Sequence, residues 1–147
     1  MNLFLDTSCL VKLYHQETGS ADLQTLFSTH SVQTVFLSEI SKVEFVSTLW
    51  KKVRTQELSA AQAMAIGQLF DRDFEKYSFV PVDDALLATA SLLIAEYGPQ
   101  GLRTLDGIQF ATCQALRGQA DVFLTADKLL QRLFALAGLV TAVPPLP

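Results

Sequence analysis

The stretch NLFLDTSCLVKLY, residues 2–14, places a short apolar run directly before an acidic residue and a helical pattern. Asn2 to Leu5 has the length and apolar character of a buried strand, which Asp6 stops. From Ser8 to Tyr14 the apolar residues follow the spacing of a helix. A strand followed at once by a helix is typical of folds in which helices connect parallel strands.

The rest of the chain repeats this alternation. Further strands are predicted from Thr34 to Leu37, Ser78 to Val82, Asp121 to Leu124 and Leu139 to Val143. Helices are predicted from Ser20 to Phe27, Ser38 to about Thr55, Ser59 to about Tyr77, Ala85 to about Tyr97, Leu105 to Leu116 and Ala126 to Ala137. Alternating strands and helices predict an α/β fold with a central parallel sheet and helices on both of its faces.

The size and composition indicate one domain, residues 1–147, because half of the residues are hydrophobic and supply a single core. The longest weakly polar stretch, Ala85 to Ala95, is shorter than the roughly 20 residues of a membrane helix. Cys9 and Cys113 are too few for a disulfide framework. Without a secretion signal at the N-terminus, we expect a cytoplasmic protein with no membrane segment.

The formal net charge is −4, which argues against a protein that grips nucleic acid mainly through a positively charged surface. It does not exclude a nuclease, because divalent ions held by an acidic cluster offset its charge locally. The surplus of carboxylates also suits a basic protein partner.

Four acidic residues lie at strand ends or in the helices that follow strands and loops. In a parallel sheet, ligands bind beyond the carboxyl ends of the strands. Asp6 ends the first strand and Asp127 closely follows a later one, whereas Asp106 lies in the first turn of its helix and Glu44 about two turns into the helix after the second strand. The places of Asp6 and Asp127 make these two acids candidates for a site.

Each acid also has an ordinary explanation. Asp6 could be a helix N-cap, and Asp106 and Asp127 could be first-turn acids that complement helix dipoles. Glu44 lies away from the helix's apolar face, so its position alone indicates a surface residue. That predicted face consists of Ile40, Val43, Val46, Leu49, Trp50 and Val53. Asp83 and Asp84 most simply begin the helix from Ala85, and we leave them outside the site.

Taken together, the segments around the four acids resemble the PIN-domain family, and within it the VapC-type toxins of toxin–antitoxin pairs. The matching segments are Leu3 to Ser8 with Leu10 to Tyr14, Leu37 to Phe45, Leu102 to Thr112, and Val122 to Leu130. They follow the family's order and span nearly the whole chain. Each is weak alone, but four in sequence are specific.

The resemblance implies a three-layer α/β/α sandwich in which the four acids form the catalytic, metal-binding set. These are Asp6, Glu44, Asp106 and Asp127. It also implies that Ser8 and Thr125 support the first and last acids through their hydroxyls. Gly107 and Gln109 depart from the family pattern, where relatives often have alanine and histidine. That departure leaves the metal set intact but puts details of substrate contact in doubt.

Such a constellation suits hydrolysis of RNA phosphodiester bonds. Carboxylates about 4 Å apart repel by roughly 4 kcal/mol per pair at an effective dielectric constant near 20, so a cation must offset them. Oxygen ligands without histidine or cysteine favour Mg²⁺ or Mn²⁺, one ion or two. The metal activates a water for attack on phosphorus and polarises the scissile phosphate.

Basic residues and partners complete the expectation. Lys51, Lys52 and Arg54 form a basic cluster that could guide RNA, and Arg103 could contact phosphate, although solvated surfaces and salt bridges explain them equally well. The resemblance implies a cognate antitoxin whose basic C-terminal segment blocks the acidic cleft, and a homodimer that uses the apolar faces between Ile40 and Phe74.

Other constellations fit less well. The chain has no Gly-x-Ser-x-Gly elbow and no phosphate-binding loop, and its two histidines, His15 and His30, are best explained as surface residues. The main alternative from another class is a non-enzymatic, Mg²⁺-binding receiver-like or protein-interaction domain. Receivers normally carry an acidic pair after the first strand, where this chain has only Asp6.

Overall fold

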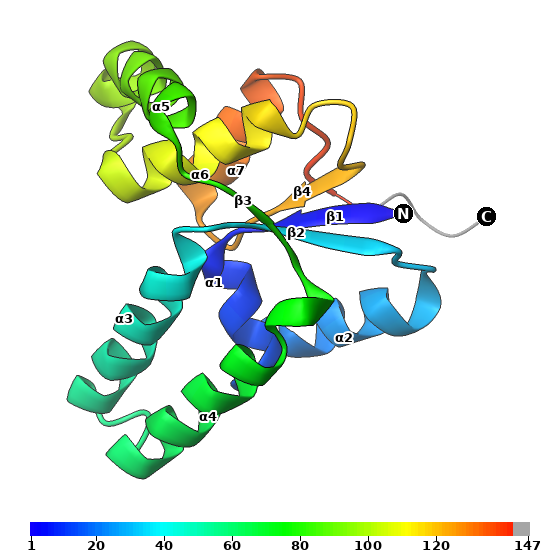
Figure 1. Cartoon of the computed structure of the whole chain (residues 1–147), viewed down its shortest axis with the longest axis vertical. Helices are drawn as coiled ribbons and strands as arrows, with labels where there is room; N and C mark the ends of the chain where they lie inside the picture. The colour runs from blue at the N-terminus through cyan, green and yellow to red at the C-terminus, as the bar shows by residue number, and fades with distance from the viewer. Residues whose placement is uncertain (143–147) are drawn as a thin grey trace.

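The computed structural model describes residues 1–142 and consists of a four-stranded parallel sheet between two layers of helices (Figure 1). The strands are β1 (Asn2–Leu5), β2 (Thr34–Ser38), β3 (Ser78–Val80) and β4 (Val122–Leu124), in the order β3-β2-β1-β4. The three-layer α/β/α architecture expected from the sequence is therefore confirmed. No helix in the described part of the chain is long and apolar enough to cross a membrane.

The helices divide between the two faces of the sheet according to sequence order (Figure 1). One layer contains α1 (Thr7–Leu10), η1 (Val11–Leu13), α2 (Ser20–Thr29), α3 (Ser41–Arg54), α4 (Ala60–Arg72) and η2 (Phe74–Lys76). The other contains α5 (Asp84–Tyr97), η3 (Gly98–Gln100), α6 (Thr104–Ala115) and α7 (Lys128–Leu136). The longer helices α3 and α4 pack together as the hairpin seen at the bottom of Figure 1.

The sheet separates two hydrophobic cores, and β1 contributes to both. Phe4 packs into the core beneath α5, α6 and α7, whereas Leu5 packs into the core beneath α1, α2 and α3. Successive strand residues point to opposite faces, so a central strand covered on both sides must be apolar throughout. Leu3, Phe4 and Leu5 are all fully buried, which explains the continuous apolar run.

The strand order reverses beside β1, and this reversal positions the site. The chain passes from β1 to β2 and β3 on one side, and β4 then pairs with the other side of β1. Where successive connections leave in opposite directions, the carboxyl ends of neighbouring strands open a crevice. The backbone N–H of Asp6 donates to the carbonyl of Leu124 at 3.1 Å, so the ends of β1 and β4 meet there.

Two sequence-based predictions of regular structure were wrong. The helix predicted from Ser59 to Tyr77 ends at Arg72, and the short 3₁₀ turn η2 follows. The segment predicted as a last strand, Leu139 to Val143, forms no strand in its described part, which ends at residue 142; Val143 lies outside the described residues. Its carbonyl at Val140 accepts one hydrogen bond from the Phe123 N–H at 2.8 Å, so it lies beside β4 without building a ladder.

The predicted buried face of α3 was wrong at three of its residues. Val43, Val46 and Trp50 are exposed, whereas Leu49 is buried as predicted, and Ser41 and Phe45 also point into the molecule. Phe45 packs on Phe70 of α4 with ring centroids 4.3 Å apart, and this aromatic contact sets the rotation of the helix. Glu44 consequently lies at the edge of the inward face and is half-buried.

Candidate metal and catalytic site

Asp6 is the most deeply buried of the four acids and performs two tasks. Its side chain caps α1 by accepting a hydrogen bond from the Cys9 N–H at 3.0 Å, which confirms the N-cap role considered from the sequence. The same carboxylate accepts the Ser8 hydroxyl on Oδ1 at 2.6 Å and the Thr125 hydroxyl on Oδ2 at 2.5 Å. Helix capping and a place in the crevice are therefore compatible.

The surroundings of Asp6 change its acidity. Burial raises the pKa of this carboxyl from 3.8 to about 6, and repulsion from Glu44 adds to the rise. The hydrogen bonds from Ser8, Thr125 and the Cys9 N–H favour the charged form and oppose part of it. Asp6 is only 3% exposed, so its negative charge has little contact with water to stabilise it.

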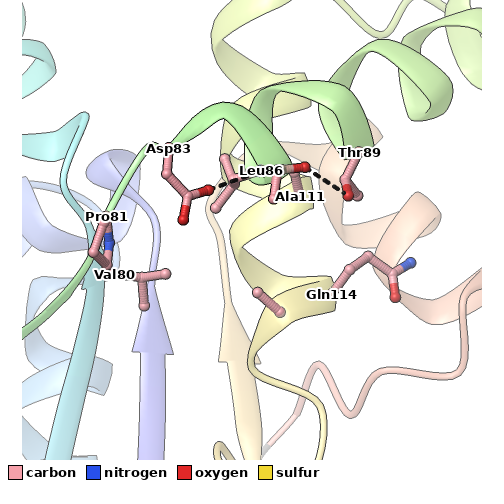
Figure 2. Close-up of a pocket in the computed structure, with 9 residues that line it drawn as sticks. Val80, Pro81, Asp83, Leu86, Thr89, Ala111 and Gln114 are labelled. Carbon is pink, nitrogen blue, oxygen red and sulfur yellow. Dashed lines mark hydrogen bonds between the residues drawn. The ribbon is translucent and has the colours of Figure 1, made fainter.

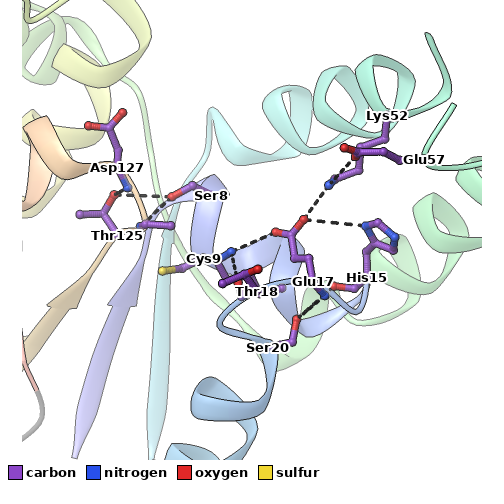
Figure 3. Close-up of polar contacts among 12 residues, drawn as sticks. Ser8, Cys9, His15, Glu17, Thr18, Ser20, Lys52, Glu57, Thr125 and Asp127 are labelled. Atoms are coloured by element: carbon purple, nitrogen blue, oxygen red, sulfur yellow. Dashed lines mark hydrogen bonds and ion pairs between the residues drawn. The ribbon is translucent and has the colours of Figure 1, made fainter. Parts of the chain in front are cut away.

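Ser8 and Thr125 link Asp6 to the start of α7. The Ser8 hydroxyl oxygen accepts the Ala126 N–H at 3.0 Å, and that of Thr125 accepts the Asp127 N–H at 3.0 Å. Figure 3 shows Ser8 and Thr125 side by side, with Asp127 next to Thr125. Each hydroxyl thus donates to the Asp6 carboxylate and fixes the backbone that carries Asp127.

Asp127 and Asp106 both lie at helix starts. Asp127 is the N-cap of α7 and accepts the Leu130 N–H at 2.8 Å, while Asp106 lies in the first turn of α6. Burial raises the pKa of Asp106, and repulsion from Asp127 and then from Glu44 raises it further; Arg103 opposes this rise. Asp106 therefore lies within electrostatic reach of acids from two other segments.

Glu44 is nearer the start of its helix than the sequence indicated. Because α3 begins at Ser41, Glu44 lies in the first turn instead of two turns in. Its Oε1 accepts hydrogen bonds from the Thr7 hydroxyl at 3.0 Å and from the Gln109 side-chain amide at 2.7 Å. An open cleft of about 310 Å³ is lined by Glu44, Arg103, Thr104, Leu105 and Asp106.

The four acids gather at one end of the sheet but do not form a closed cage. Electrostatic repulsion couples Asp6 to Glu44, and Asp106 to both Glu44 and Asp127. Within residues 1–142, however, no three acidic, histidine or cysteine side chains converge tightly enough to hold one ion as they stand. Mg²⁺ keeps several waters and often takes only one or two protein carboxylates, so this all-oxygen set suits it.

Comparisons with known proteins identify the family of this chain. A family model described as the PIN domain matches residues 3–134, which is most of the chain. The chain belongs to the PIN-domain family.

Relatives of this PIN domain cover nearly all of it. The chain is 24% identical to ribonuclease VapC47 of Mycobacterium tuberculosis over 144 residues, which are 97% of this chain and 96% of the relative. Among solved structures, M. tuberculosis VapC20, described as a sarcin-ricin loop cleaving toxin, superposes with a TM-score of 0.71 at 17% identity, covering 97% and 99% of the two chains. A toxin–antitoxin complex from Klebsiella pneumoniae gives 0.65 at 18% identity, covering 95% and 96%. The two structural likenesses show the fold.

The basic residues proposed to contact RNA are not equivalent in this PIN domain. Lys52 is 12% exposed and forms ion pairs with Glu17 at 2.6 Å and Glu57 at 3.2 Å (Figure 3). It therefore ties α3 to the loop before α2. Lys51 and Arg54 are both exposed on the same helix, and Arg103 is exposed on the wall of the acidic cleft.

Sequence reasoning missed three polar residues beneath the cleft. Thr7, Ser41 and Gln109 are all buried, and their side chains meet in one hydrogen-bonded group with Glu44. Thr7 carried a weak signal because it follows Asp6, and Ser41 lies three residues before Glu44. In the sequence, Gln109 is distinguished only by its departure from the family pattern.

A separate hollow between β3, α5 and α6 lacks this chemistry. Figure 2 shows this pocket of about 360 Å³ with Asp83 at its edge. Asp83 accepts the Leu86 N–H at 2.9 Å and caps α5, as expected from the sequence. It is the only carboxylate among the pocket's described lining residues, so the pocket offers no second acidic cluster.

Proposed function

We propose that this PIN domain is a metal-dependent endoribonuclease and the toxin of a type II toxin–antitoxin pair. The observation that carries the proposal is the electrostatic repulsion between acids from separate segments, which links Asp6 to Glu44 and Asp106 to both Glu44 and Asp127. Asp106 is repelled electrostatically by both Asp127 and Glu44, which come from two other segments. Purely local helix caps would not need to meet. The relatives named ribonuclease VapC47 and sarcin-ricin loop cleaving toxin VapC20 support the same reading.

The proposed cofactor is Mg²⁺ or Mn²⁺, as one ion or two. Its ligands would be drawn from Asp6, Glu44, Asp106 and Asp127. Burial and repulsion between neighbouring acids raise the pKa of Asp6 and of Asp106, and a bound cation would offset this repulsion. When bound, a divalent ion polarises a phosphate and makes an attacking water more acidic. The ion and the acids are one functional unit.

The chain's own residues orient these acids and the RNA. Ser8 and Thr125 each donate to one oxygen of Asp6, so its carboxylate has one fixed orientation. Arg103 lies on the cleft wall near Asp106, where its guanidinium can meet a phosphate in bidentate fashion. Lys51 and Arg54 are the proposed guides for the RNA backbone, since Lys52 is engaged in ion pairs.

The proposed protein partners are a cognate antitoxin and a second copy of this chain. The acidic cleft fits a basic C-terminal antitoxin segment, whose arginine could pair with a carboxylate in place of the metal. Structural neighbours of this chain include a toxin–antitoxin complex. The exposed apolar residues of α3 supply the proposed homodimer surface.

Cleavage of RNA by the purified protein tests the proposed activity. We expect cleavage with Mg²⁺ or Mn²⁺, its loss on chelation, and a loss of at least about 100-fold in Asp6→Asn, because catalytic metal sites supply several kcal/mol. The matched control is Asp84→Asn, an exposed first-turn acid of α5 that should cleave like wild type. Equal activity of Asp6→Asn and wild type, or cleavage that survives chelation, contradicts the mechanism. Tight Mn²⁺ binding without cleavage of any tested RNA would favour the non-enzymatic alternative.

A further inference from the structure

The buried group beneath the cleft directs its donors at one atom. Oε1 of Glu44 accepts the Thr7 hydroxyl at 3.0 Å and the Gln109 Nε2 at 2.7 Å. Ser41 belongs to the same group, because its hydroxyl oxygen lies 3.0 Å from that of Thr7 and accepts a hydrogen bond from Gln109 Nε2 at 3.2 Å. The donors come from α1 and α6, so two helices hold a carboxylate that belongs to a third.

The other oxygen of Glu44 is left out of this arrangement. Among the described residues, Oε2 accepts no hydrogen bond, whereas Oε1 accepts two. Glu44 also lines the open acidic cleft. Fixing one oxygen of a carboxylate fixes the direction of the other, so the donors to Oε1 determine where Oε2 lies relative to the remaining acids.

Gln109 is a poor residue for packing alone at this position. It is 2% exposed, and its Oε1 is buried without a partner in the described part of the chain. An unsatisfied buried carbonyl destabilises the folded state, and an apolar side chain of the same length would avoid that cost. Turning the amide over would place its oxygen against the Glu44 carboxylate. The site therefore requires the donor.

We propose that Gln109 is a positioning residue that, together with Thr7, holds Glu44 in the orientation required for metal binding. This inference rests on the proposed function, in which Glu44 is a ligand. It also gives a role to the position where this chain departs from the family pattern: Gln109 acts through Glu44 and not through contact with RNA. Groups that orient ligands typically contribute 10- to 100-fold to metal affinity or activity.

The test measures Mn²⁺ affinity by titration calorimetry, apart from RNA cleavage. Gln109→Met keeps the length of the side chain and removes both donors, and we expect Mn²⁺ to bind about 10-fold more weakly. Gln109→His, which retains an N–H donor, should recover part of the affinity. In a Glu44→Gln background, Gln109→Met should cause no further loss, because the ligand that it positions is already gone.

A purely structural role would give a different pattern. If Gln109→Met binds Mn²⁺ as wild type does, or weakens it equally in the Glu44→Gln background, the positioning role is overturned. Thr7→Val removes the second donor with little change of shape and provides the same test should Gln109→Met fail to fold. If the wild type binds Mn²⁺ but cleaves no RNA, only the proposed ribonuclease activity is contradicted. If the wild type binds no Mn²⁺, both the proposed function and the positioning role of Gln109 are contradicted.

Discussion

At the scale of single residues, the Asp6 carboxylate stabilises the fold as a helix cap and destabilises it as a buried charge. As the N-cap of α1 it satisfies the Cys9 N–H, an arrangement that typically contributes about 1 kcal/mol. Its charge is buried and repelled by Glu44, so it destabilises the metal-free folded state. The raised pKa of Asp6 is the consequence of this burial and repulsion. The hydroxyls of Ser8 and Thr125 reduce that penalty without removing it.

Replacing Asp6 by asparagine should therefore stabilise the metal-free protein at neutral pH. The pKa of Asp6 is about 6 in the folded state and near 3.8 in the unfolded chain, so folding favours its protonated form. Its favourable contribution is complete below pH 3.8 and is lost as the pH rises through 6. With chelator present at pH 7.5, Asp6→Asn should be more stable than wild type, with a gain on the order of 2 kcal/mol.

Urea unfolding at pH 7.5 and pH 4 measures this effect. The stability gain of Asp6→Asn should largely disappear at the lower pH, whereas Asp84→Asn, at an exposed position, should show no such trend. A stability gain of equal size at both pH values, or no gain at pH 7.5, would contradict the view that the ionised Asp6 carboxylate destabilises the metal-free protein.

At the scale of elements, the sequence predicted the alternation of strands and helices but not the rotation of α3. Period and composition alone placed Val43 and Trp50 inside and Glu44 outside on α3. With Phe45 packed on Phe70, Val43 and Trp50 are exposed and Glu44 is half-buried. Such tertiary contacts between distant segments leave no local signal. The hydrogen bonds from Gln109 to Glu44 were missed for the same reason, since 65 residues separate them.

The acids themselves were within reach of the sequence, because strand ends in a parallel sheet share one edge. Asp6 and Asp127 follow adjacent parallel strands, so their proximity follows from topology once the strands are recognised. For Asp106 and Glu44, position along the chain gave little guidance, and only the family resemblance singled them out. Their ligand roles stay predictions.

The packing of α5 on α6 depends on Gly107, which directly follows Asp106. A Cβ atom at this position would lie 2.6 Å from Cδ1 and 2.7 Å from Cγ1 of Ile94. Alanine usually stabilises a helix by about 1 kcal/mol relative to glycine, but overpacking costs roughly 1–3 kcal/mol. We expect Gly107→Ala to destabilise the protein by about 1 kcal/mol.

A double-mutant cycle in urea isolates this contact. Ile94→Ala removes the two clashing atoms, so Gly107→Ala should become neutral or stabilising in that background. If Gly107→Ala is equally destabilising with and without Ile94, close packing of the two helices is not the reason for the glycine.

At the scale of the whole molecule, the inward rotation of Phe45 leaves an apolar surface on α3. Val43 is 67% exposed, and Val46 and Trp50 extend the surface along the helix. The proposed homodimer would cover it. In light scattering we expect the mass of two chains for wild type and of one chain for Val43→Glu. Leu136→Glu, at a residue 64% exposed on α7, serves as the control and should keep the wild-type mass.

A dimer that persists in Val43→Glu, or a wild type that is monomeric at every concentration, contradicts this use of the surface. Neither result would affect the acidic site, because Val43 takes no part in the hydrogen bonds that hold Glu44.

The central claim is that acids from separate segments together bind one or two divalent ions, and Mn²⁺ binding in solution tests it most directly. Titration of the metal-free protein should show Mn²⁺ binding that weakens at least about 10-fold in Asp6→Asn and in Asp106→Asn. Asp84→Asn, which keeps all four site acids, should bind as wild type does. Wild type without measurable Mn²⁺ binding, or equal binding by all of these variants, would contradict the claim.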